Sequence, residues 1–474
     1  MSKQEINGPL KGALDDSTSI ESQPQAGTLE QYLMEEIAAE ADNEIKYRTC
    51  SWQKTAALLF CEYICLAMMS FPNSYSVLGL VPGLILTVFV SLTMFYTGLV
   101  LWEYCLRNPR VRDMCDIGQK LLGDKRWGWY FTATMFMLNN TFVCGVHVFT
   151  GRNYLETVAP GKVCGVVYGI VVAIVCFLFS LPRTFASMSW PALFSAGTMG
   201  LSVVLAMIFS GVQDAPANYD PAIPVKYNLF PAPGTTFVQG MNAFLNIAFT
   251  FAGQVTYPSF IAEMRNPREF KKSLACVTVA ELVLFSLTGA IIYVYVGNEY
   301  MTAPAFGSLQ IKYDKIAFSF TVPAIIFLGV LYAAVAARFI FFRIFRDNRR
   351  HLTSNTKTGW LVWGGILLST WLIAFVIAEG IPIFNDLLSL LCSLFSCWFG
   401  FIFWGIAYFT MRYEDYGAGW YLRLRSPKAI ILFALNVFII ACGLVIMGPG
   451  TYATVQSIIN AFNEGTVGGA FSCQ

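Results

Sequence analysis

The chain has 474 residues, of which 56% are hydrophobic and only 13% are charged, and its formal net charge is +2. Soluble proteins carry about 25% charged residues, so this composition excludes an ordinary soluble protein and indicates a chain mostly surrounded by lipid. The near-neutral charge also excludes a strong electrostatic field for nucleic acid, and we expect no such partner.

Residues 1–50 form a polar segment that precedes the first apolar run. They lack the basic start and apolar stretch of a cleavable signal. We expect a largely disordered tail on the cytoplasmic side of the membrane. Residues 29–41 are amphipathic, and the alternative is a regulatory segment whose Leu29, Leu33 and Ile37 dock on the rest of the chain.

Eleven apolar segments follow the tail, each about as long as a helix that crosses a bilayer. They predict an all-α polytopic membrane protein, with a transmembrane domain at residues 51–448 and an extracytoplasmic tail at 449–474. The predicted spans are 54–79, 81–105, 127–157, 163–181, 186–212, 237–261, 271–297, 316–343, 359–380, 384–410 and 429–448.

The distribution of basic residues predicts the orientation, because Lys and Arg resist translocation across the membrane. With the N-terminus in the cytoplasm, the eleven spans place most of the 31 Lys and Arg residues on the cytoplasmic side. The exceptions are Arg152, Lys162, Lys226, Lys312 and Lys315.

Two of the predicted spans contain residues that interrupt a helix. Pro72 lies inside the first span, and Gly253 and Pro258 lie inside the sixth. Matched breaks five helices apart are typical of transporters built from inverted repeats, in which the unwound turns bind a small charged substrate near the bilayer midplane. We therefore expect repeats at 54–212 and 237–410 and an extra helix at 429–448. The alternative is two ordinary proline kinks.

Polar residues form stripes at helical spacing inside three of the apolar spans, and such stripes must face protein or water rather than lipid. Together they predict a polar pathway, although each residue alone is explained by hydrogen bonding between helices. The stripes are Asn140, Cys144, His147 and Gly151 in the third span, Gln239, Asn242, Asn246, Thr250 and Gly253 in the sixth, and Asp386, Ser389, Ser393 and Ser396 in the tenth.

The energy source is predicted by elimination. There is no phosphate-binding GxxxxGK[ST] motif, no cluster of metal ligands and no Ser/His/Asp grouping, so we expect no ATP hydrolysis, no cofactor and no enzyme. An ion gradient is the remaining source. Three intramembrane residues are candidates for proton coupling: Glu62 first, then Glu281 and then His147. Glu62 is alternatively the group that binds a substrate ammonium, and each of the three also has a purely structural interpretation.

The 13 cysteines are scattered, and several lie inside apolar runs, where cysteine is usually a small buried hydrophobic residue. A disulfide between Cys164 and Cys473, which both fall on the outer side, is the less favoured alternative to free thiols.

Several segments together resemble the amino acid/auxin permease family, and within it the fungal neutral amino acid permeases. The resemblance covers most of residues 50–445. It is carried by ALLFCEYICLAMMSFPNSYSVLGLVPGLIL, DIGQKLLGDKRWGW, FAGQVTYPSFIAEMRNPREFKKSL and VPAIIFLGVLYAAVAARFIFFRIFR, of which the third segment is the most specific.

The resemblance implies a leucine-transporter-like fold of five plus five helices with one extra helix, and import of neutral amino acids with protons. By position it implies a substrate site at both breaks, with Phe251 and Tyr332 shaping the side-chain pocket. We add Asn140 to this predicted site because it lies on the polar stripe of the third span. The implied residues are Ala67, Met68, Met69 and Ser70 in the first break, and Thr250, Phe251, Ala252 and Gly253 in the sixth.

Two departures from the family pattern affect the expected size of the substrate and the identity of the coupling ion. Ala67 stands where family members commonly have Gly, which limits the approach of the backbone to a substrate. The eighth span offers Ala333, Ala334, Ala336 and Ala337 where sodium-coupled relatives place hydroxyl groups, which favours protons over sodium.

The sequence therefore predicts a proton-coupled amino acid importer that works by alternating access. The alternatives are a sodium-coupled transporter and a nutrient-sensing receptor with the same fold, for which the long tail is the only hint. We expect an integral plasma-membrane protein, with the vacuolar membrane as the alternative.

Overall fold

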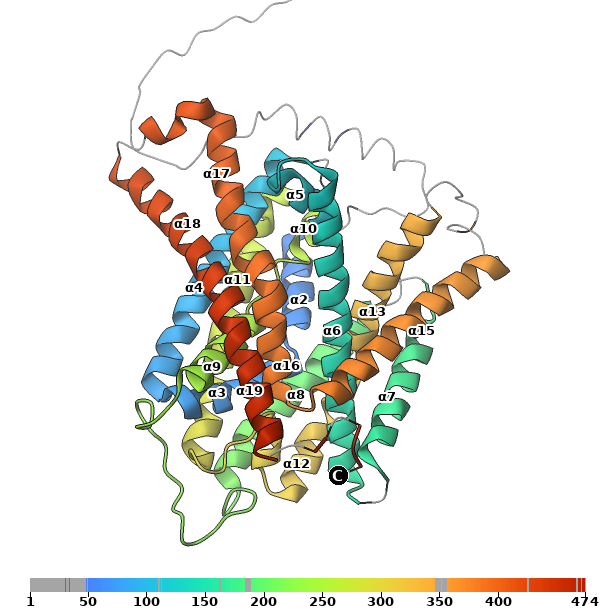
Figure 1. The fold of residues 1–474 in the computed structure, drawn as a ribbon, viewed down its shortest axis with the longest axis vertical. Coiled ribbons are helices and arrows are strands. Elements are labelled where there is room, and N and C mark those ends of the chain that lie inside the picture. The colour runs from blue at the N-terminus through green and yellow to red at the C-terminus, as the bar shows by residue number, and fades with distance from the viewer. Residues whose placement is uncertain are drawn as a thin grey trace, which may run out of the picture.

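The computed structural model of the chain is a bundle of helices (Figure 1). It describes residues 30, 34, 48, 50–109, 111, 113–161, 163–183, 189–345, 351, 356–423, 426–465, 468–469 and 471–473. Most of the predicted tail at 1–50, including Leu29, Leu33 and Ile37, lies outside the described residues.

The N-terminal half contains helices at each of the first five predicted spans. They are α2 (Trp52–Tyr63) with η1 (Leu66–Ser70) and α3 (Phe71–Leu78), then α4 (Leu80–Arg107), α6 (Arg126–Val158), α7 (Gly165–Ser180) and α8 (Ser189–Val212). The short helix α5 (Met114–Leu121) lies between α4 and α6.

The C-terminal half contains helices at the other six predicted spans. They are α9 (Phe237–Thr250) with α10 (Tyr257–Glu263), η2 (Pro267–Glu269) leading into α11 (Phe270–Val296), α13 (Val322–Ile344), α15 (Lys357–Gly380), α16 (Phe384–Leu391) with η4 (Cys392–Ile402) and α17 (Phe403–Tyr416), and α18 (Pro427–Val445) with η6 (Ile446–Gly450) and α19 (Thr451–Asn463). The short elements η3 (Ala305–Ser308) and η5 (Gly417–Arg423) lie outside these spans. The eighth span was predicted to start at 316, but residues 316–319 belong to the separate short helix α12 (Ile311–Ser319).

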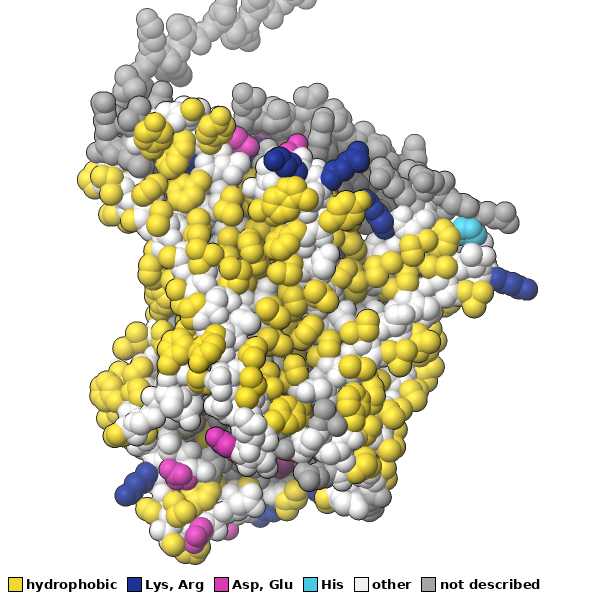
Figure 2. Space-filling model, in the orientation of Figure 1, with side chains coloured by type: hydrophobic (Ala, Val, Ile, Leu, Met, Phe, Trp, Pro, Cys, Tyr) yellow, Lys and Arg dark blue, Asp and Glu magenta, His cyan; other side chains and the backbone are white. Residues whose placement is uncertain are grey.

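Length and hydropathy identify a polytopic membrane protein. Seven helices of the described chain are long and apolar enough to cross a membrane, or eight if the bent first unit counts as one span. Figure 2 shows apolar side chains over the middle of the visible face and charged side chains gathered towards its two ends. Large apolar side chains such as Phe194, Leu361 and Ile431 are well exposed, as expected of surfaces that contact lipid.

The two ends of the bundle are distinguished by the short helices that cover them. Helix α5 lies at one end and α12 at the other, and they are called here the α5 face and the α12 face (Figure 1). In each broken unit one half points to each face: α2 and α10 lie towards the α5 face, and α3 and α9 lie towards the α12 face.

The first break lies earlier than predicted. Helix α2 ends at Tyr63, the chain turns at Ile64 and Cys65, and the two halves are bent by 47°. Pro72 does not interrupt this unit, because it lies in the first turn of α3, where its missing N–H has no helical partner to lose.

The break in the sixth span is confirmed. Helix α9 begins at a capping box formed by Thr236 and Gln239 and ends at Thr250. Residues 251–256 do not continue the helix, and α10 starts at Tyr257 with Pro258 in its first turn. Gly253 lies in the middle of this non-helical segment, as predicted.

The last helix is longer than predicted. Its end was expected near residue 448, before the sequence Gly448-Pro449-Gly450, but the chain stays helical from Pro427 to Asn463. Pro449 lies in η6, a π-helical turn, where the regular hydrogen-bond pattern is already altered and the missing N–H is tolerated. The first half of the predicted tail at 449–474 is therefore helix.

The residues after α19 fold back onto the turn between α6 and α7. Cys473 forms a disulfide bond with Cys164, the alternative that the sequence favoured less. The Phe471 ring also contacts Phe375 of α15, with 6.0 Å between ring centroids. The end of the chain is thus fixed at the α12 face.

This disulfide predicts a simple biochemical result. With a protease site inserted in the 213–236 connection, the two fragments are expected to stay joined on a non-reducing denaturing gel and to separate on reduction. Cys473→Ser is expected to separate them without reductant, whereas Cys276→Ser, at an exposed free cysteine, keeps them joined. Separation of the unreduced wild-type fragments would contradict the pairing.

Candidate functional site

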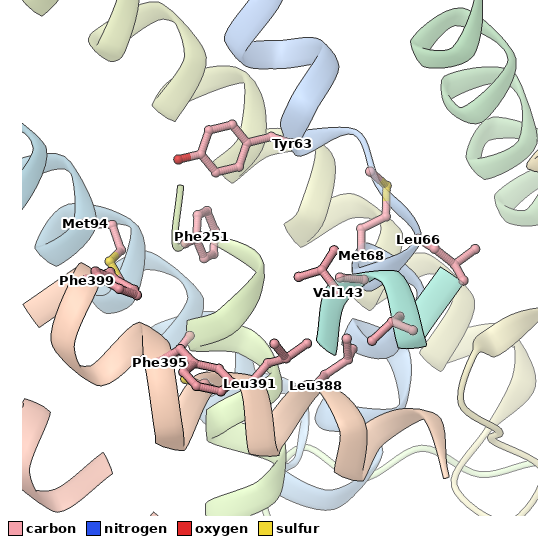
Figure 3. Packing of buried hydrophobic residues seen from close by; sticks show 14 of the residues in the cluster. Tyr63, Leu66, Met68, Met94, Val143, Phe251, Leu388, Leu391, Phe395 and Phe399 are labelled. Carbon is pink, nitrogen blue, oxygen red and sulfur yellow. The ribbon is translucent and has the colours of Figure 1, made fainter. Parts of the chain in front are cut away.

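The two broken units contact each other at their breaks. The hydroxyl group of Tyr63, the last residue of α2, hydrogen-bonds that of Tyr257 at the start of α10. The Tyr63 hydroxyl also lies directly against Gly253, so that a Cβ atom at this position would overlap with it. Figure 3 shows the Tyr63 and Phe251 side chains within the buried apolar cluster that also contains Met68 and Val143. A side chain from one break therefore fills the space left by a glycine in the other.

Glu62 places a carboxylate beside this contact. Its Oε2 accepts a hydrogen bond from the Thr256 hydroxyl at 3.0 Å, and its Oε1 accepts one from the Tyr332 hydroxyl at 3.2 Å. Thr256 belongs to the sixth-span break and Tyr332 to α13, so one carboxylate connects three spanning units. Both donors are neutral, and Glu62 makes no ion pair within the described part of the chain. An intramembrane carboxyl group without a cation is expensive, and such groups commonly have a function.

Two cavities meet at Glu62. The larger cavity, of about 490 Å³, is within the range of small-molecule sites. The smaller, of about 40 Å³, is lined by Gly253, Asn139 and Ser396 among others. Glu62, Val255 and Tyr332 line both. The larger cavity extends from Glu62, Asn140 and Tyr332 to Asp113, Glu263 and Arg338 near the α5 face.

A second carboxyl group lies nearby in α11. Glu281 is buried, with 4% of its surface exposed, and its Oε1 has no hydrogen-bond partner. It is close enough to Glu62 and to the two tyrosines for their charges to interact. Glu281 does not line either cavity.

The three predicted polar stripes have different surroundings. The sixth-span and tenth-span stripes face each other, since the Ser389 hydroxyl lies 3.2 Å from both Asn246 Oδ1 and the Asn242 carbonyl oxygen. The third-span stripe packs on α13 instead: Cys144 contacts the Gly329 carbonyl at 3.6 Å, and His147 hydrogen-bonds the backbone of Ile325. These contacts match the structural interpretation of His147, and His147 does not line either cavity.

Residues 48–456 match the family model described as transmembrane amino acid transporter protein. The chain belongs to this transporter family. It is 31% identical over 93% of its length to the N amino acid transport system protein of Neurospora crassa, of which it covers 92%. It is also 28% and 26% identical to proteins named transmembrane transporter in Gibberella moniliformis and Fusarium pseudograminearum, over 92% of this chain and 90% of each relative.

Membership in the amino acid transporter family indicates transport rather than catalysis. In this transporter, the predicted substrate residues Asn140, Ala252, Gly253 and Tyr332 line one or both cavities, together with Glu62. The third span, the eighth span, the sixth-span break and the end of α2 thus contribute to one site.

The other predicted substrate residues of the transporter do not line the cavities. Ala67, Met68, Met69 and Ser70 form the 3₁₀ turn η1 and are buried, and the Ser70 hydroxyl donates back to the Ala67 carbonyl at 2.7 Å. Thr250 and Phe251 are buried too, and Phe251 packs against Phe71 and Phe285 with ring centroids 6.1 and 5.1 Å away. Side chains of a tight turn are directed by packing, which sequence position alone does not show.

Sequence reasoning did not name Asn139, Thr256 or Ser259 as site residues, and it named Ser396 only as part of the tenth-span stripe. Signals for three of these residues were present. Thr256 lies inside the break segment GQVTYP, Asn139 precedes the predicted Asn140, and Ser396 ends the tenth-span stripe. Within the described chain, no group of three metal-ligating side chains accompanies them.

Proposed function

We propose that this transporter imports neutral amino acids together with protons by alternating access. The observation that carries the proposal is the position of the Glu62 carboxylate. It lies at the junction of two cavities, between two helix breaks, with only neutral hydrogen-bond donors. A carboxyl group in this position can bind a proton in one state of the cycle and release it in another.

The larger cavity is the proposed amino acid site. Val255 and Thr256 of the sixth-span break line it, and backbone groups freed at such a break are suited to the charged groups of an amino acid. Much of the remaining lining is apolar and includes Leu58, Phe136, Phe260 and Leu331, which favours an uncharged substrate side chain. The charged residues Asp113, Glu263 and Arg338 lie farther away, near the α5 face.

Protons are favoured over sodium by the chemistry of α13. Ala333, Ala334, Ala336 and Ala337 are buried at the positions where sodium-coupled relatives place hydroxyl groups, and a hard cation needs several oxygen ligands. Each elementary charge that crosses 100 mV releases about 2.3 kcal/mol, more than the roughly 1.4 kcal/mol of a tenfold amino acid gradient. One proton per substrate is therefore sufficient for uphill import.

The α5 face is the proposed cytoplasmic side. Arg107, Lys120 and Lys125 lie on the connection that contains α5, in agreement with the excess of basic residues in cytoplasmic loops. In this orientation the N-terminal tail is cytoplasmic and the larger cavity faces inward. The plasma membrane is the proposed location, and the vacuolar membrane is the alternative. We further propose that the two broken units open two inverted repeats of five spans each.

Transport in proteoliposomes tests the proposed function. An imposed gradient that is acidic on the outside is expected to drive accumulation of a radiolabelled neutral amino acid above its outer concentration, and a protonophore is expected to abolish it. A panel of unlabelled competitors then defines the substrates. Accumulation that requires sodium and ignores pH would refute proton coupling, and saturable binding without flux would indicate a sensor.

A further inference from the structure

A further buried carboxyl group lies near the α12 face, outside the cavity site. Asp386 is in the first turn of α16, with only 3% of its surface exposed. Its Oδ1 accepts a hydrogen bond from Asn242 Nδ2 of α9 at 3.3 Å, and its carboxylate also accepts one from the Ser457 hydroxyl of α19. Asp386 therefore connects three helices through neutral partners.

This connection belongs to a larger buried network. The Thr454 hydroxyl donates to Asn242 Oδ1 at 3.1 Å, and Ser389 hydrogen-bonds both Asn242 and Asn246. Asn242, Ser389 and Thr454 are each at most 7% exposed. The network thus joins the α12-side half of the sixth-span break to α16 and α19, and α9 must separate from these helices if the α12 side is to open.

Among the residues that the structure describes, no charged group balances Asp386. Helices α9 and α19 contain no basic or acidic side chain, and their single titratable residue, Tyr452, points away with 61% of its surface exposed. The π-helical turn η4 contributes only Cys392 and Cys397 as titratable groups. Helix α6, which also packs on α16, carries His147, Arg152 and Glu156 in this region, and none of them interacts electrostatically with Asp386.

Glu379, another buried acid near this face, differs from Asp386 in having a cationic partner. Glu379, at the end of α15, is 1% exposed and forms an ion pair of 2.6 Å with Arg152, which also pairs with Glu156 at 2.9 Å. A buried charge normally needs such a partner, because desolvation of an unpaired ion costs several kcal/mol. The neutral surroundings of Asp386 therefore suit a carboxyl group that is protonated when it is buried.

We propose that Asp386 controls, by binding and releasing a proton, the contact of α9 with α16 and α19 that closes the α12 side. This contact is called here the α12-side gate, and the proposed role of Asp386 is called the latch. Asp386 binds a proton when the gate closes and releases it when the gate opens. This inference rests on the proposed transport function. When the gate is open, water solvates the carboxylate and its ionised form is stable. Closing and protonation therefore favour each other reciprocally. The proton returns to the side from which it came, so Asp386 adds nothing to the number of protons carried per amino acid.

The test is amino acid exchange in proteoliposomes with equal pH and equal substrate on both sides, which removes all driving force. The Glu62→Gln background removes the titration of the proposed carrier. In this background we expect exchange to slow as the pH rises, by up to about tenfold per pH unit for one linked proton. Adding Asp386→Asn, which keeps the shape but cannot titrate, is expected to make the rate independent of pH.

Two further variants separate the latch from a structural role. Thr454→Val breaks the same network without removing the acid and is expected to keep the pH dependence, and Asp386→Glu is expected to keep it as well. If Asp386→Asn leaves the pH dependence unchanged, or if Thr454→Val abolishes it equally, the latch is refuted. Neither result bears on the proposed function, which is tested separately by the protonophore sensitivity of wild-type accumulation.

Discussion

Replacing Glu62 by glutamine is expected to abolish uphill amino acid accumulation and to leave exchange partly intact. Glutamine keeps the size of the side chain and an oxygen that accepts from Thr256 or Tyr332, so the two breaks stay connected. Glutamine cannot bind and release a proton, so the proton gradient no longer drives import. That gradient otherwise supplies about 2.3 kcal/mol for each charge that crosses 100 mV. The ratio of inside to outside substrate is expected to fall to about one, as measured by radiolabelled uptake under an imposed pH gradient.

The control is Glu299→Gln, the same change at an exposed residue in the connection after α11. This variant is expected to accumulate substrate like the wild type. If Glu62→Gln still accumulates amino acid with normal pH dependence, Glu62 is not the proton carrier, and Glu281 becomes the next residue to substitute. Loss of both accumulation and exchange would place Glu62 in substrate binding instead.

The second large effect is expected at Gly253. An alanine Cβ at this position overlaps with the Tyr63 hydroxyl and with the ring carbon that bears it. The two breaks then have to move apart, and overpacking of this kind costs about 1–3 kcal/mol, which corresponds to roughly a 5- to 140-fold effect on an equilibrium. We expect the initial uptake rate of Gly253→Ala to fall by about tenfold or more at equal protein amounts in the membrane.

Gly240 provides the matched control, because it lies on the preceding helix α9 and a Cβ there meets no atom within 4 Å. Gly240→Ala is expected to transport normally. Combining Gly253→Ala with Tyr63→Leu, which removes the overlapping ring atoms, is expected to restore part of the activity. A normal rate for Gly253→Ala alone would show that the contact between the breaks does not matter for transport.

The spanning segments were largely predictable from the sequence, because hydropathy and helix length are local properties. Predicted ends agree closely for α4 and α6, at Leu80–Arg107 and Arg126–Val158. The exceptions involve proline, whose effect depends on its position in a helix. Pro72 begins a helix rather than breaking one, and Pro449 is accommodated in a π-helical turn.

The candidate site was predictable only where the chemistry is unusual in a membrane. Glu62 was singled out because a carboxyl group inside an apolar span is costly, and Gly253 because glycine interrupts a helix. The residues of η1 were assigned to the substrate site from their sequence position alone. In the structure they are buried in the core instead. The neutral surroundings of Asp386 within the described helices depend on which helices meet, so no local pattern predicts them.

The most direct test of the account is a cryo-EM structure of the transporter in lipid with a saturating concentration of an amino acid that it transports. We expect substrate density in the larger cavity, in contact with Val255 or Thr256 and adjacent to Glu62 and Tyr332. Density at a different location, or an empty cavity under conditions where binding is saturated, would contradict it.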